Sequence, residues 1–174
     1  NDNGTVRAIG RCATQDLGTG AWTVCTQMTA MLTGLPMDRT RFELGDTQLP
    51  PGGVSVGSAP TTSVGQALSE AAGKLRDALH KIINDGAPSP LAGLEPAKIK
   101  LAGDRVVAID DPGKFVMVLD LIKRSGRAYV EGMSEKSENG ADDIGSDATI
   151  PWRALASLKL SFNERRMPGP NEML

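Results

Sequence analysis

The chain has 174 residues, 19 of them basic and 21 acidic, and aromatic residues make up only 3%. That length suits one domain with a core of aliphatic residues, alanine and methionine. The mixed charges form no basic stripe, which excludes a typical nucleic-acid-binding protein. The sequence has neither an apolar run of roughly 20 residues nor a basic-then-apolar leader. We therefore expect no membrane partner and a cytoplasmic location, with periplasmic export in a complex as the alternative.

The few cysteine and histidine residues limit the chemistry further. Cys12 and Cys25 are too few for a disulfide framework or a zinc site, and we expect two buried thiols. His80 is the only histidine and lies in a helical pattern. A structural role is expected for it, because one histidine supports neither a histidine metal site nor a Ser-His-Asp triad.

The first third of the chain predicts strand, helix and strand. Residues 4–14 alternate apolar and basic side chains, which indicates a strand with one face toward the core. Residues 20–36 predict a helix, stopped by Gly34 and Pro36. Its expected apolar stripe consists of Val24, Met28, Met31, Leu32 and Leu35. Residues 38–46 predict a second strand, and the crossover suits two parallel strands or neighbours in a mixed sheet.

A loop rich in Gly, Pro, Ser and Thr follows at 47–63, a length typical of functional or disordered segments. Residues 63–83 then predict the clearest helix, with Ser63 as its N-cap. The apolar stripe of this helix consists of Val64, Leu68, Ala71, Ala72, Leu75, Leu79 and Ile82.

The remainder predicts a smaller unit. Strands are expected near 99–101 and 105–109, a helix near 115–124 and a short strand at 128–131. The acidic stretch 134–147 is typical of a mobile linker. The predicted fold is α+β: a mixed sheet with two main helices on one face and a smaller strand-helix appendage. We divide it into residues 1–88, 89–133 and 134–174, the last a linker and tail of uncertain order.

Two glycine-rich loops each precede a predicted helix: Gly18-Thr19-Gly20, led by the acidic Asp16, and Gly57-Ser58. A helix N-terminus carries unpaired N–H groups and partial positive charge, and glycine lets a backbone approach a ligand closely. Either both loops bind an anionic ligand, or both are tight turns with N-caps. The residues alone leave both open, because neither loop is a G-x-G-x-x-G or P-loop motif.

The order of motifs from "QDLGTGAWTVCTQM" through "LGDTQLP" to "SVGQAL" resembles the molybdenum-binding large subunit of the xanthine dehydrogenase and aldehyde oxidoreductase family. The likeness is close from Gly4 to about Leu79. In that family the two loops hold a molybdenum-pterin cofactor, often as a cytosine dinucleotide. The resemblance implies a set of cofactor-binding residues: Leu17, Gly18, Thr19, Gly20, Gly57, Ser58 and Ala59.

The same resemblance implies an enzyme that hydroxylates aldehydes or N-heterocycles with water as the oxygen source. Its expected partners are the other large-subunit domains and iron–sulfur and FAD subunits or domains. Many members have Gln in the middle of the first loop. This chain has Thr19 there instead, which resembles the bacterial aldehyde oxidoreductase branch. The G-x-G-E motif that carries the general base is absent, and "GPNE" at 169–172 does not replace it. We therefore expect the chain alone to be inactive, with no catalytic or metal-ligating residue of its own. We also expect the isolated chain to lack cofactor and to self-associate through exposed apolar surface. The alternative is a non-catalytic scaffold or interaction domain that no longer binds cofactor.

Overall fold

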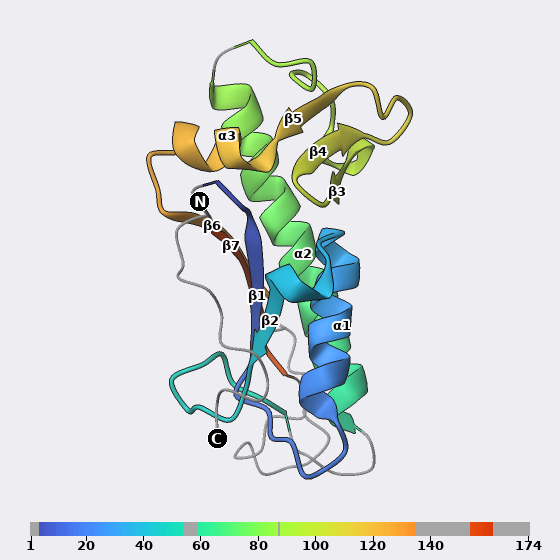
Figure 1. Cartoon of the computed structure of the whole chain (residues 1–174), viewed down its shortest axis with the longest axis vertical. Helices are drawn as coiled ribbons and strands as arrows, with labels where there is room; N and C mark the ends of the chain where they lie inside the picture. The colour runs from blue at the N-terminus through green and yellow to red at the C-terminus, as the bar shows by residue number, and fades with distance from the viewer. Residues whose placement is uncertain (1–3, 54–58, 87, 135–153, 162–174) are drawn as a thin grey trace, which may run out of the picture.

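The computed structural model describes residues 4–53, 59–86, 88–134 and 154–161 (Figure 1). Two sheets and three α-helices make up this part of the chain. Sheet A has the strand order β2-β1-β7-β6 and sheet B the order β3-β4-β5. In chain order the elements are β1 (Arg7–Arg11), α1 (Ala21–Thr33), β2 (Thr40–Glu43), α2 (Ala59–Asp85), β3 (Ile99–Ala102), β4 (Arg105–Ala108), β5 (Phe115–Met117), α3 (Val118–Arg124), β6 (Tyr129–Met133) and β7 (Ser157–Ser161), with short 3₁₀ turns at Met37–Arg39 and Pro96–Lys98.

Sheet A is mixed. Its strand β1 runs parallel to β2, with Ala8 opposite Thr40, and antiparallel to β7, with Ala8 opposite Leu160. Helix α1 supplies the crossover that two parallel strands require. The strand-helix-strand prediction for the first third of the chain is confirmed.

Helices α1 and α2 pack on the same face of sheet A (Figure 1). The core between them contains Ala8, Leu79 and Leu158, each fully buried. Because alternate strand residues face opposite ways, Val6 and Ala8 point into this core and Cys12 into a second cluster, as their spacing predicted. Arg7 and Ile9 on the other face of β1 are also buried. The α+β class with two main helices on one face is confirmed.

The buried stripe of α1 differs from the predicted one. Its buried residues are Ala21, Cys25, Thr29 and Thr33. Met31, expected inside, is 76% exposed. Small residues at every fourth position let α1 lie close to β1, and the Thr29 hydroxyl donates to the Cys25 carbonyl, which satisfies it without water. Of the predicted stripe, Leu35 alone is fully buried, beyond the end of the helix.

Helix α2 begins earlier than predicted. It starts at Ala59, and Ser63 is not its N-cap. The Ser63 hydroxyl instead accepts a 2.8 Å hydrogen bond from the Ala154 amide, 91 residues further along the chain. Five residues of the predicted stripe of α2 are buried: Val64, Leu68, Ala71, Leu75 and Leu79. Ala72 and Ile82 are only partly buried, and Ile83 is buried in place of Ile82.

The smaller unit consists of sheet B and α3. Residues Phe115–Met117 form strand β5 rather than the first turn of a helix, because they pair with β4. Arg39, at the end of the 3₁₀ turn before β2, links the unit to β2 because its Nη1 donates to both carboxylate oxygens of Asp104, at 2.9 and 3.0 Å. Strands β6 and β7 lie in sheet A, so that sheet draws on all three predicted segments of the chain. The division at residues 88 and 133 stays a prediction.

Three features predicted from the sequence lie outside the described residues: Gly57, Ser58 and the acidic stretch 135–147. Within the described ranges, no helix has the length and apolarity needed to span a bilayer.

Candidate functional site

The first glycine-rich loop leads into α1 at one end of sheet A (Figure 1). Gly18 and Gly20 have φ angles of 85° and 74°, in the left-handed region that favours glycine. Among the described residues, no atom of another part of the chain lies within 4 Å of the place where a Cβ would stand on either residue. Within the described structure the glycines are therefore required by backbone conformation and not by packing, and the space over the loop is open. Leu17, between Asp16 and Gly18, is 69% exposed.

The amides of this loop converge on one carboxylate, that of Asp16. Gly18 and Gly20 donate to its Oδ1 at 3.0 and 3.2 Å, and Trp22 donates to its Oδ2 at 3.2 Å. The Trp22 amide is the main cause that lowers the pKa of Asp16, followed by smaller contributions that include the other loop amides. The loop amides thus already bind an anionic oxygen pair, that of Asp16.

Only part of the second predicted loop lies within the described residues. Gly57 and Ser58 lie outside the described residues, and Ala59 is the first residue of α2. Both helices begin at the same end of the molecule (Figure 1). Their second and third turns share one apolar cluster, in which Cys25 of α1 lies with Val64 and Leu68 of α2. The starts of the two helices are therefore neighbours, while a cleft between Gly18 and Gly57 remains a prediction.

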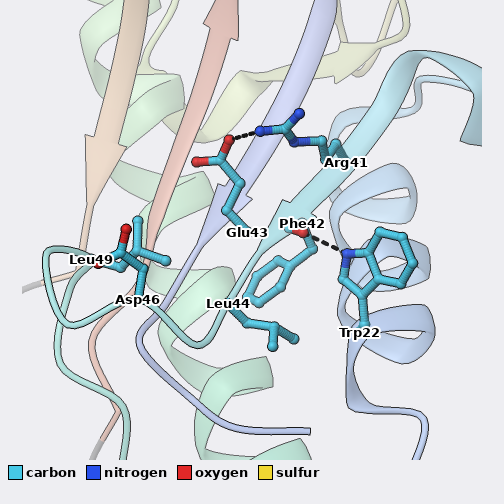
Figure 2. A pocket seen from close by; sticks show the side chains of 7 residues that line it. All are labelled: Trp22, Arg41, Phe42, Glu43, Leu44, Asp46 and Leu49. Atoms are coloured by element: carbon cyan, nitrogen blue, oxygen red, sulfur yellow. Dashed lines mark hydrogen bonds and ion pairs between the residues drawn. The ribbon is translucent and has the colours of Figure 1, made fainter. Parts of the chain in front are cut away.

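A pocket of about 410 Å³ lies next to the first loop, at the free edge of β2 (Figure 2). The residues that line it come from α1, β2 and the following loop: Trp22, Arg41, Phe42, Glu43, Leu44, Asp46 and Leu49. Trp22 joins the pocket to the glycine loop, because its amide binds Asp16 and its indole Nε1 donates a 2.6 Å hydrogen bond to the Phe42 carbonyl. The sequence analysis missed this pocket; Trp22, two residues after Gly20, was the available indication.

The charges at the pocket are paired with one another. Glu43 accepts a 2.8 Å hydrogen bond from Arg11 Nε and forms a second ion pair with Arg41 (Figure 2). Arg11 and Glu43 lie opposite each other on β1 and β2. The pocket wall therefore offers two carboxylates beside the apolar Trp22 and Leu49 side chains: Glu43, shared between two guanidinium groups, and Asp46, which accepts the Gln48 amide at 2.9 Å.

The described residues contain no cluster of His, Cys, Asp and Glu that could hold a metal ion. Burial raises the pKa of both Cys12 and Cys25 to about 11, which keeps the thiols protonated and makes them poor metal ligands. The prediction of two buried free thiols is confirmed. His80 is structural, as expected, with its Nε2 atom 2.7 Å from the Leu94 carbonyl.

Fold and loop together define an α+β domain with a glycine loop at the start of a helix, whose amides bind the carboxylate of Asp16. The sequence matches the molybdopterin cofactor-binding domain family over residues 1–154. The chain belongs to this family, and the resemblance to the molybdenum hydroxylases is confirmed.

Two solved structures share the fold. The crystal structure of the Cu,Mo-CO dehydrogenase in its carbon monoxide reduced state gives a TM-score of 0.52 at 20% identity, over 97% of this chain and 18% of that one. The reconstituted CO dehydrogenase from Oligotropha carboxidovorans gives 0.50 at 21% identity, over 93% and 17%. The chain therefore spans less than a fifth of the length of these relatives. No curated protein matches the sequence significantly.

Proposed function

We propose that this chain forms part of the cofactor site of a molybdenum hydroxylase, an enzyme that hydroxylates aldehydes or N-heterocycles with oxygen from water. The first loop, Leu17-Gly18-Thr19-Gly20, and the second, Gly57-Ser58-Ala59, hold the molybdenum-pterin cofactor in its cytosine dinucleotide form. The cofactor supplies the metal-centred oxidation when bound.

One observation carries the proposal: an exposed loop with two left-handed glycines, open space above both, and amides that already converge on an anion. Such a loop brings backbone close to a ligand, which a side chain at either position would prevent. Leu17 and Thr19 alternate with the glycines and are exposed, so they are the side chains that meet the ligand first.

The chain's residues bind and orient; none is assigned a proton transfer. The G-x-G-E motif that carries the family's base is absent from the sequence. Activity therefore requires the other large-subunit domains, and iron–sulfur and FAD partners to remove electrons. The isolated chain is proposed to be inactive and to retain cofactor weakly.

Molybdenum retention tests this function. The chain is mixed with the other large-subunit domains and the isolated molybdenum-pterin cofactor, the mixture is passed through a desalting column, and the retained metal is measured by elemental analysis. We expect retention by the wild type and a loss of most of it in Gly18→Ala/Gly20→Ala, because alanine strains a backbone with positive φ. Gly126→Ala is the matched control, since Gly126 has φ 67° and open space around it but lies after α3.

A second candidate is favoured by a specific observation, the occupation of the loop amides by Asp16. A loop whose donors are satisfied internally suits a scaffold or interaction domain that kept the fold and lost the ligand. No molybdenum retained by the wild type, or equal retention by wild type and the double glycine variant, would establish this candidate instead.

A further inference from the structure

We propose that Asp16 is the positioning residue of the cofactor loop, whose carboxylate holds Gly18 and Gly20 in their left-handed conformations before any ligand arrives. The role in cofactor binding rests on the proposed function, whereas the role in holding the loop does not.

The loop is held by hydrogen bonds among its own residues. Residues 15–20 are exposed, and no atom lies near the Cβ positions of the two glycines. The N-cap of α1 is Gly20, which has no side chain to cap the helix. The hydrogen bonds that span the loop run to Asp16, which receives the amides of Gly18, Gly20 and Trp22. Asp16 thus takes the place of an N-cap side chain from four residues upstream.

The segment that leads to Asp16 is held in place by other parts of the chain. Thr14, two residues earlier, is 1% exposed, and its carbonyl accepts a 2.9 Å hydrogen bond from Gly45. The neighbouring Ala13 amide donates to the Pro50 carbonyl at 2.7 Å, and the backbone of Gly52 packs directly on Thr14. A rigid segment therefore leads to Asp16, and Asp16 in turn fixes the loop and the first turn of α1.

With these amides directed at Asp16, the outward face of the loop consists of Leu17, Thr19 and the open space over the glycines. Without the carboxylate, Gly18 and Gly20 are free to adopt many conformations, and ordering them again weakens ligand binding. Asp16 acts through the loop and does not itself contact the ligand.

The test compares Asp16→Ala and Asp16→Asn with the matched control Asp111→Asn. Asp111 is an exposed aspartate whose Oδ1 accepts the Gly113 amide at 3.2 Å in a distant turn. Amide exchange and ¹⁵N shifts are recorded for Gly18, Gly20 and Trp22 in the chain without cofactor. We expect these amides to exchange at least about tenfold faster in Asp16→Ala, because they lose hydrogen bonds to a charged acceptor. We expect no change in their exchange in Asp111→Asn.

A pH titration gives a readout that a general loss of stability does not. In the wild type, the Gly18, Gly20 and Trp22 shifts should move together with one midpoint below 3.8, the ordinary pKa of an aspartate. In Asp16→Asn this common titration should vanish. Wild-type amides that titrate separately, or equal exchange in wild type and Asp16→Ala, would overturn the positioning role.

Molybdenum retention separates this inference from the proposed function. We expect Asp16→Ala to retain several-fold less molybdenum than wild type at a temperature where both chains are fully folded. Equal or greater retention means that Asp16 competes with the ligand instead of preparing its site, and overturns the inference in its cofactor role. No retention by the wild type refutes the proposed function, while the amide measurements still decide whether Asp16 holds the loop.

Discussion

The indole of Trp22 donates to the backbone carbonyl of Phe42 across 2.6 Å and thereby ties the first turn of α1 to the outer edge of β2. An edge strand leaves alternate backbone groups unpaired, and such groups can pair with another chain. The Trp22 side chain satisfies one of them and forms one wall of the pocket (Figure 2). The same residue therefore connects the glycine loop, the helix and the sheet.

Replacing Trp22 with Phe tests this connection. The variant keeps an aromatic ring but removes the donor, which leaves the Phe42 carbonyl to water. We expect a loss of about 0.5–1.5 kcal/mol in the free energy of unfolding, the usual net contribution of one hydrogen bond, measured by urea denaturation. An unchanged midpoint would show that water replaces the indole at no cost.

Gly132 of β6 lies against the backbone of α2. A Cβ at this position would stand 2.8 Å from the Leu75 Cα atom and closer still to the Leu75 amide and the Ala71 carbonyl. Backbone cannot move aside as a flexible side chain can, so Gly132→Ala should separate helix from sheet. We expect at least about 1–3 kcal/mol of destabilisation, the typical cost of overpacking, seen as a lower thermal midpoint.

Gly73 of α2 provides the opposite case. Nothing lies within 4 Å of its Cβ position, and it is in the interior of a helix. Gly73→Ala should raise stability by roughly 0.5–1 kcal/mol because alanine favours the helix. If both glycine variants lose stability equally, the close contact at Gly132 is not what decides the effect.

Truncation of one leucine and of one methionine tests which faces of α2 and α1 are buried. Leu79 of α2 is fully buried, and Leu79→Ala should cost about 2–5 kcal/mol through lost burial and a cavity. Met31 of α1 is 76% exposed, and Met31→Ala should change stability by less than about 0.5 kcal/mol. A large loss of stability in Met31→Ala would show that the face of α1 predicted from the sequence is the buried one.

The two thiols give a prediction for alkaline pH. Burial raises the pKa of Cys12 and Cys25 in the folded chain from 9.0 to about 11. A raised folded-state pKa means that the unfolded chain loses these protons first, so stability is complete below pH 9 and declines as the pH rises toward 11. Denaturation at a series of pH values should show this decline, and a Cys12→Ala/Cys25→Ala variant should show less of it.

Alkylation provides a second measurement of the same thiols. At pH 8 the folded chain should react slowly with iodoacetamide because little thiolate is present and access is blocked. Unfolding in urea should expose two reactive thiols per chain. Rapid labelling of the folded chain would contradict the burial of Cys12 and Cys25.

The sequence by itself determined the elements whose patterns are local. Alternation fixed the inward face of β1, and the regular stripe from Val64 to Leu79 fixed the buried face of α2, because a side chain's direction follows from the period of its element. Gly18 and Gly20 announced a turn before α1, since left-handed backbone strongly favours glycine. The motif order also gave the family.

Only the tertiary structure decided which partners those elements meet. Strand β7 completes sheet A from a segment with weak local pattern, because its pairing with β1 spans about 150 residues and leaves no local trace. Met31 lies outside because the close approach of α1 to β1 selects small side chains for the buried stripe. The acceptor of the loop amides proved to be Asp16, a local contact across two to six residues that was not predicted from the sequence.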